Sequence, residues 1–310
     1  MTVFDEATAV HRRSDGGYDT TLDLRFAVVA PGNKAPAAVN GGILMVTVLR
    51  AVLDSAPQPH PVATSASFLR VPQLAPAEVQ VSWLKRGRTA STARAVLIQG
   101  GEPVLDTTIT TGTLHAGPVA PQAALPAGGT DAAAAGSSVS ARDFPASALE
   151  WTGGRDAFPD ITECVDLGKW PGTVGADGTE GFAGQVEVLL DPACTGWRHH
   201  QPRGVPEMRG YVRLRDDREP DALLLALAVD ALPPVVFGLG ATGWTPTVTL
   251  TWHMRAVPAP GPLQVAARSR HVSGGWFDEE AEVWDAAGRL VAQSRQIARL
   301  GRGRLRAPTE

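Results

Sequence analysis

The chain has 310 residues, of which 44% are hydrophobic and 19% charged, with a net charge of −4 and a pI of about 6.0. This composition leaves room for two folded domains, and the weak negative charge disfavours nucleic acid or an anionic membrane as a partner. Cys164 and Cys194 are too few for a disulfide framework and have no metal-ligand spacing, so no metal or cofactor is expected. Residues 1–6 lack the basic start and apolar core of a signal peptide, which favours a cytoplasmic location.

The first half of the sequence predicts a strand, a long apolar helix and an antiparallel meander. Alternating residues indicate a strand over 20–29. Asn40-Gly41-Gly42 then opens the apolar run 43–53, which is too long for most strands and follows a residue that caps helices well. We therefore expect one buried helix there. Further strands are expected between Pro or Gly turns, at 62–70, 78–85, 92–99 and 104–114.

The middle of the chain changes composition. Residues 116–141 are mostly Ala, Gly, Pro and Ser, as in a linker. Beyond them, Trp151, Phe158 and Trp170 indicate that part of the following segment packs against something. We divide the chain into an N-terminal domain (1–115), a connection (116–179), a C-terminal domain (180–303) and a tail (304–310).

The second half repeats the plan of the first. A helix is expected over 221–231, because the run is apolar and Pro233-Pro234 cannot continue it. Those prolines and Asp230 also make the apolar stretch 223–239 a poor membrane span. The expected strands are 185–190, 208–214, 247–255, 263–271, 276–284 and 290–300.

Similar segments in the two halves have near-equal internal spacing. From Arg70 to Val104 is 34 residues, and from Arg255 to Leu290 is 35. This spacing indicates a duplicated domain, each copy a helix wrapped by a curled sheet. The predicted fold is therefore α+β, a tandem double hotdog with two antiparallel sheets, each wrapped around a long central helix. Two α+β domains of another kind are the alternative.

Several short motifs, taken in order, resemble those of the type II acyl-CoA thioesterase family, a double-hotdog group that hydrolyses acyl-CoA thioesters. The resemblance covers roughly residues 20–115 and 180–302. It is carried by Asn40-Gly41-Gly42, Ser67-Phe68-Leu69-Arg70, the run 227–234, Trp244-Thr245-Pro246-Thr247-Val248 and the run 288–296.

The resemblance implies a catalytic set. In that family an Asp on the second-half helix, a Thr opening the next strand and a Gln on the last strand position the attacking water. These roles fall on Asp230, Thr247 and Gln296. The run after Thr247 departs from the family pattern, so Thr249 is an alternative, and Asn40 stands where many relatives have His.

Asp230 is unusual on physical grounds alone. It follows a run that is apolar on every face and therefore buried, where a carboxylate costs several kcal/mol unless it is hydrogen-bonded or paired. The C-terminal end of a helix does not stabilise a negative charge. The alternative is a structural Asp bonded to the Pro-rich turn.

Gln296 is the second unusual residue. Strict alternation places it on the less polar face of the last strand with Ala292, Ser294 and Ala298, so its amide needs buried partners. The aligned first-half residue is the shorter Thr110. This asymmetry indicates a single site built mainly by the second half.

Thr247 has competitors on its own strand. Strict alternation puts Thr247, Thr249, Thr251 and His253 on one side. Threonine is common in strands, so each of the three can be purely structural.

The expected substrate contacts come from the first half. Amides at Asn40-Gly41-Gly42 could stabilise an oxyanion, although capping and close packing explain these residues equally well. Arg86 and Arg88 beside a turn could meet the phosphates of coenzyme A, with a solvated hairpin tip as the alternative.

The predicted function is acyl-CoA thioesterase, with direct attack of an oriented water on an acyl-CoA or acyl-carrier thioester. No Gly-x-Ser-x-Gly elbow or phosphate-binding Gly loop occurs in the sequence. A hotdog hydratase or dehydratase is a weaker alternative, since position 40 lacks His. A non-catalytic protein that binds acyl thioesters or another hydrophobic ligand is a third. Assembly into a homo-oligomer is expected by analogy.

Overall fold

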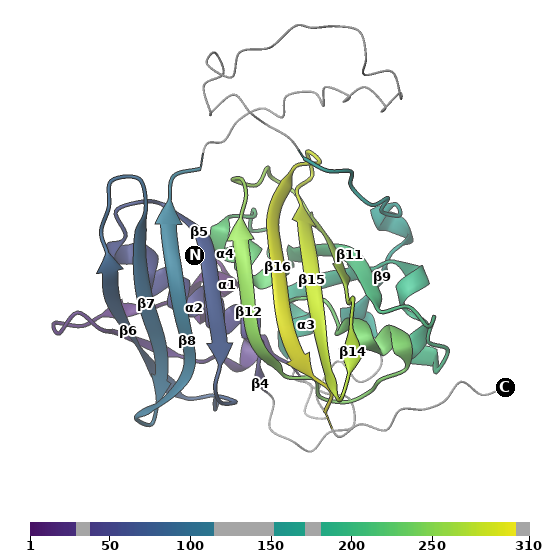
Figure 1. Ribbon diagram of the computed structural model, residues 1–310, viewed down its shortest axis with the longest axis horizontal. Helices are drawn as coiled ribbons and strands as arrows, with labels where there is room; N and C mark the ends of the chain where they lie inside the picture. The colour runs from purple at the N-terminus through teal and green to yellow at the C-terminus, as the bar shows by residue number, and fades with distance from the viewer. Residues whose placement is uncertain (29–37, 115–151, 171–180, 302–310) are drawn as a thin grey trace, which may run out of the picture.

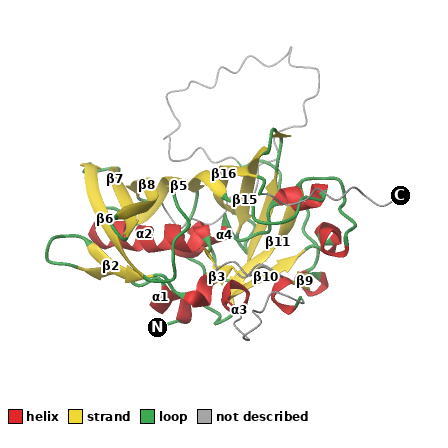
Figure 2. Ribbon diagram, turned by 90° about the horizontal axis from the view of Figure 1, so that it is seen from below, coloured by secondary structure: helices red, strands yellow, loops and turns green. Residues whose placement is uncertain are grey.

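The computed structural model describes residues 1–28, 38–114, 152–170 and 181–301. Within these ranges one 14-stranded antiparallel sheet runs through the molecule in the order β1-β2-β6-β7-β8-β5-β12-β16-β15-β13-β11-β10-β9, with β14 paired to β15. The helices α2 and α4 lie on the same side of this sheet, whose two ends curl around them (Figure 2). The expected connection at 116–141 and the tail at 304–310 fall outside the described residues.

The prediction of two separate sheets is corrected by the pairing at the centre. β5 (His60–Phe68) belongs to the first half and β12 (Thr247–Met254) to the second, and they pair antiparallel (Figure 1). Ser65 and Thr251 also share a hydroxyl–hydroxyl hydrogen bond of 3.1 Å across this seam. Joining the two sheets satisfies the backbone groups that two exposed edges would leave unpaired.

The first half follows the predicted order with one exception. The expected strand at 20–29 is interrupted after β2, because the Asp23 carboxylate caps a 3-10 turn (η1, Leu24–Phe26) by accepting from the Arg25 amide at 2.8 Å. The chain then forms a separate two-stranded sheet from β3 and β4. The elements of this half are α1 (Val3–Ala7), β1 (His11–Arg12), β2 (Tyr18–Thr21), β3 (Ala27–Val28), β4 (Ala38–Val39), β6 (Pro76–Lys85), β7 (Ser91–Gln99) and β8 (Glu102–Gly112).

The predicted central helix of the first half is confirmed as α2 (Gly41–Ser55). The Asn40 side chain caps it by accepting from the Ile43 amide at 3.3 Å. Residues 42–49 are buried without interruption, so the helix is surrounded on every face.

The second-half helix is shorter than predicted. α4 (Ala222–Ala228) ends before Asp230, whose amide instead donates to the Leu227 carbonyl at 3.0 Å in a tightened final turn. The prolines that follow prevent any extension. Among the described residues, only the first half therefore has a long central helix, and Asp230 lies in the turn after α4 rather than on it.

The remaining second-half elements surround α4. A small edge strand, β9, pairs with β10, and the predicted packing of Phe158 and Trp170 is confirmed by ring contacts with Tyr211 and Trp197; Trp151 lies outside the described residues. Every helix in the described ranges falls short of the length and apolar character of a membrane span. The elements are η3 (Ile161–Glu163), β9 (Val165–Asp166), η4 (Leu167–Lys169), α3 (Gly181–Gln185), β10 (Val186–Leu190), η5 (Pro192–Cys194), η6 (Gly196–His199), β11 (Glu207–Leu214), η7 (Val235–Leu239), β13 (Leu263–Arg268), β14 (Val272–Ser273), β15 (Trp276–Trp284) and β16 (Leu290–Arg299).

Candidate active site

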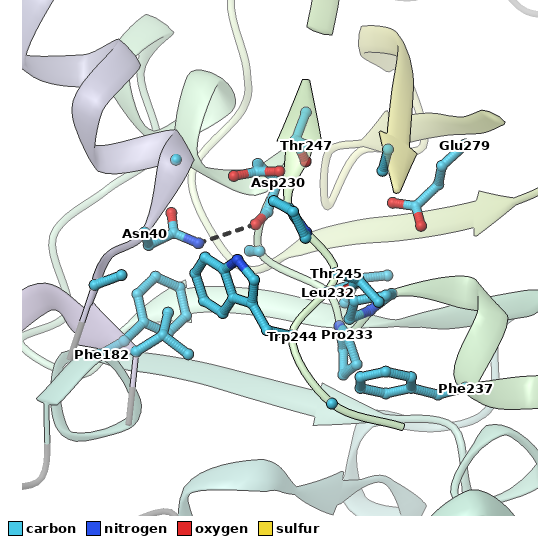
Figure 3. A pocket seen from close by; sticks show the side chains of 18 of the residues that line it. Asn40, Phe182, Asp230, Leu232, Pro233, Phe237, Trp244, Thr245, Thr247 and Glu279 are labelled. Atoms are coloured by element: carbon cyan, nitrogen blue, oxygen red, sulfur yellow. Dashed lines mark hydrogen bonds between the residues drawn. The ribbon is translucent and has the colours of Figure 1, made fainter. Parts of the chain in front are cut away.

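A cavity of about 1260 Å³ opens where the two halves meet. Its walls come from the start of α2, the turn after α4, the beginning of β12 and the inner faces of β15 and β16. Much of the lining is apolar or aromatic, including Phe182, Phe237 and Trp244 (Figure 3). A large apolar pocket with a few convergent polar groups is the usual form of a small-molecule site.

Asp230 lies on the cavity wall against the start of α2 (Figure 3). The Asn40 Nδ2 donates to the Asp230 backbone carbonyl at 3.1 Å and fixes the turn. A Cβ placed on Gly41 would be only 2.7 Å from the Asp230 Oδ2. The carboxylate can occupy this place because position 41 has no side chain.

The environment of Asp230 changes its acidity. Burial raises the pKa of this carboxyl to about 7, and a hydrogen bond from the Gly42 amide partly opposes that shift. The partial positive charge at the start of α2 acts in the same direction as the Gly42 amide. The C-terminal end of α4 cannot stabilise the Asp230 carboxylate. The stabilisation therefore comes from α2, in the other half of the molecule.

Thr247 and Gln296 are brought together at the same cavity. The Thr247 Oγ1 donates to the Gln296 Oε1 at 2.7 Å. The expected face of Gln296 is confirmed, since it is buried between Ser294 and Ala298 on the inner face of β16.

The expectation that Thr247 shares a face with Thr249 is wrong, because the strand contains a β-bulge. Thr249 pairs with Ile297, but Thr247 pairs with Ala298, so Val248 is an extra residue. The extra residue turns Thr247 to the inner face, while Thr249 remains exposed on the outer one.

Glu279 is a further site residue that the sequence reasoning missed. It is buried on β15 directly opposite Gln296, and its Oε1 accepts from the Gln296 Nε2 at 2.8 Å. Its Oε2 accepts from the Val235 amide at 3.0 Å. The available signal was its place in the alternating apolar positions Phe277, Ala281 and Val283.

The acidity of Glu279 is perturbed in the same direction. Burial, together with the negative charge of Asp230, raises the pKa of this carboxyl to about 7 against the opposing hydrogen bonds from Val235 and Gln296. Two carboxyl groups with raised pKa values thus face one cavity, an arrangement typical of functional sites. Among the described residues no three His, Cys, Asp or Glu side chains gather as a metal site would require.

The structure does not bring Arg86 and Arg88 to this cavity. Their turn contacts Gln58, just before β5 begins, whereas the cavity is lined by Phe68, where β5 ends. Arg86 instead stacks on Trp83, 4.4 Å from the ring centroid. Asn40 and Gly41 do line the cavity, and its wall also includes basic side chains that suit an anionic group, namely Arg70, Arg198, His199 and His200.

Comparisons with known proteins identify the family of the chain. The family model "Acyl-CoA thioesterase N-terminal domain" matches residues 30–113, and "Acyl-CoA thioesterase C-terminal domain" matches residues 161–300. Uncharacterized proteins of Mycobacterium tuberculosis and Mycobacterium bovis are each 32% identical over 246 residues, which is 78% of this chain and 77% of theirs.

Solved structures show the same architecture. A Thermobifida fusca protein described as a candidate thioesterase II is 36% identical, covers 97% of this chain and 98% of its own, and gives a TM-score of 0.77. A hot dog fold protein of unknown function from Alicyclobacillus acidocaldarius covers 100% of both chains at 20% identity and a TM-score of 0.70. The predicted hotdog architecture is thereby confirmed, in the form of one continuous sheet. The chain belongs to the acyl-CoA thioesterase family.

Proposed function

We propose that this protein hydrolyses acyl-CoA thioesters by direct attack of a water molecule that Asp230 and Thr247 hold. The observation that carries the proposal is the Asp230 carboxyl on the cavity wall, with a pKa of about 7, in the same cavity as the Thr247–Gln296 pair. A general base is most effective when its pKa lies near the working pH.

In the proposed reaction Asp230 accepts one proton of the water while the water oxygen bonds to the thioester carbonyl carbon. The resulting oxyanion is stabilised by the amide of Gly41 at the start of α2, which lies on the cavity wall. The carbon–sulfur bond then breaks, and the leaving thiolate takes the proton from Asp230. The products are a carboxylic acid and a free thiol, and no covalent enzyme intermediate is needed.

The experiment that tests the proposal measures thiol release from acyl-CoA substrates of varied chain length. Asp230→Asn should lower kcat about 10²- to 10⁴-fold, the range expected for loss of a general base. The matched control is Asp217→Asn, on an exposed turn where the backbone has a φ of 55° that Asn accepts readily.

Two outcomes would contradict the proposal. Full activity of Asp230→Asn would reject Asp230 as the base. Saturable binding of acyl-CoA by the wild-type protein without thiol release would favour the non-catalytic binding protein. The expected homo-oligomer and cytoplasmic location stay predictions, to be checked by solution mass and by fractionation.

A further inference from the structure

The hydrogen bonds beside Asp230 form a single row. One end of the row fixes its direction, meaning which group donates and which accepts in each bond. The row runs from the Val235 amide through Glu279 and Gln296 to Thr247. A backbone N–H can only donate, and an ionised carboxylate can only accept. Ionised Glu279, the form that predominates above its pKa of about 7, therefore accepts from both of its neighbours.

This constraint passes along the row to Thr247. Because Glu279 accepts, the Gln296 amide must turn its NH₂ group toward Glu279 and its carbonyl toward Thr247. The Thr247 hydroxyl must then donate its only proton to that carbonyl. The Thr247 oxygen can then only accept further hydrogen bonds, through its lone pairs.

We infer that Glu279 is a positioning residue that sets the direction of this row and so makes Thr247 an acceptor for the nucleophilic water. This inference rests on the proposed function. A water that donates one proton to Thr247 and the other to Asp230 has its lone pairs directed elsewhere. The pair of acceptors therefore selects the orientation in which the water oxygen can attack a carbonyl carbon.

A purely structural role explains Glu279 poorly. It is 5% exposed, and a buried carboxylate is costly even when it is hydrogen-bonded. The negative charge of Asp230 adds to that cost. A neutral residue would fill the same place at a lower cost in folding free energy.

The first test is Glu279→Gln. The new side chain must turn its carbonyl toward the Val235 amide, so its NH₂ group faces Gln296. Gln296 must then flip, and Thr247 becomes a donor toward the cavity. We expect kcat for acyl-CoA hydrolysis to fall about 10- to 100-fold, with KM changed less than about threefold because ground-state binding is retained. The matched control is Glu282→Gln, which removes the same charge from the outer face of β15.

The second test exchanges the two residues. In the double variant Glu279→Gln with Gln296→Glu, Glu at position 296 accepts from Thr247 and from the NH₂ group at position 279. The carbonyl at 279 still accepts from Val235, so the original direction is restored. The double variant should be at least about fivefold more active than either single variant, a rescue that simple packing at 279 would not produce.

The outcomes separate the two proposals. Wild-type kcat in Glu279→Gln, or a double variant no more active than Gln296→Glu alone, would overturn the inference while leaving hydrolysis intact. If Glu279→Gln fails to fold, as circular dichroism would show, the comparison of the double variant with Gln296→Glu decides. Absence of thiol release by the wild-type protein would overturn the proposed function and this inference with it.

Discussion

Two carboxyl groups, Asp230 and Glu279, face one cavity with different partners. Asp230 contacts the start of α2 through the Gly42 amide, whereas Glu279 accepts hydrogen bonds from Val235 and Gln296. Different surroundings give similar residues different roles. In the proposed mechanism Asp230 transfers the proton and Glu279 sets the orientation of the hydrogen bonds.

The raised pKa values predict the pH dependence of turnover. kcat/KM should rise as pH increases through about 7, because both carboxyls, with pKa values of about 7, must be ionised in the proposed site. The measurement is kcat/KM from pH 5 to 9 with an acyl-CoA substrate. A profile that stays flat between pH 5 and 8 would contradict the assignment of Asp230 as the base.

The same shifts predict the pH dependence of stability. The folded protein binds a proton at each of these carboxyls more tightly than the unfolded chain does. In the unfolded chain the pKa values are the ordinary ones, 3.8 for Asp230 and 4.5 for Glu279. The free energy of unfolding should therefore fall as pH rises from about 4 to about 7. Urea unfolding should show that Asp230→Asn is more stable than wild type at pH 8 and that this advantage is much smaller at pH 5. If the unfolding free energies of Asp230→Asn and wild type differ by the same amount at both pH values, folding does not raise the pKa of Asp230.

At the scale of elements, the start of α2 determines where Asp230 can lie. A Cβ at position 41 would be 2.7 Å from the Asp230 Oδ2 and 3.0 Å from the Phe68 ring. The first distance would force the Asp230 carboxylate to move, and the second would require a small shift of the Phe68 ring, so the close approach rather than the backbone angles favours Gly at position 41.

We predict that Gly41→Ala lowers kcat by about tenfold or more, because it displaces the Asp230 carboxylate from the cavity wall. Thiol-release kinetics and thermal melting test this. Gly101→Ala is the control for a glycine far from any neighbour, although its φ of 81° makes it lose stability. If Gly41→Ala keeps wild-type kcat, the contact between α2 and Asp230 has no catalytic role.

The bulge in β12 determines which threonine faces the cavity, and this leads to a second prediction. Thr247→Val should lower kcat about tenfold, since its hydroxyl contacts Gln296 on the inner face. Thr249→Val is the matched control, because Thr249 is exposed on the outer face and should be silent. The reverse result in acyl-CoA hydrolysis would assign the site threonine to position 249.

At the scale of the whole molecule, the site needs both halves. β5 pairs with β12, and a Cβ on Gly42 would lie 2.9 Å from the Leu227 Cα, so the helices of the two halves are in direct contact. Asp5 also bridges the halves through ion pairs with Arg50 and Arg218 at 2.6 and 3.2 Å. The first half supplies the α2 amides, and the second supplies the acidic and amide side chains.

We predict that residues 1–114 and 152–310 produced separately have no thioesterase activity, whereas co-expression restores it. Each part alone exposes an unpaired strand and removes either Asp230 or the α2 amides that face it. Thiol release from the purified parts and from the co-expressed pair measures this. Activity of the second part alone would show that α2 is dispensable for catalysis.

The sequence by itself determined the duplicated architecture, most strands, helix α2 and Gln296 as a buried polar residue, and it singled out Asp230 as a carboxylate beside an apolar run. These follow from local periodicity and from the cost of placing a polar group on an apolar face. Strict alternation also carried a signal for Glu279, because it places this carboxyl on the same strand face as Phe277, Ala281 and Val283.

Only the tertiary structure decided the rest, because each remaining feature depends on contacts between segments distant in sequence. The joining of two sheets into one depends on the β5–β12 pairing, and the inward turn of Thr247 depends on a bulge defined by its partner strand. The α2 amides meet Asp230 only because residues 42 and 230 lie side by side in the fold. No local pattern encodes such distances, so Arg86 and Arg88 were plausible from the sequence and yet lie away from the cavity.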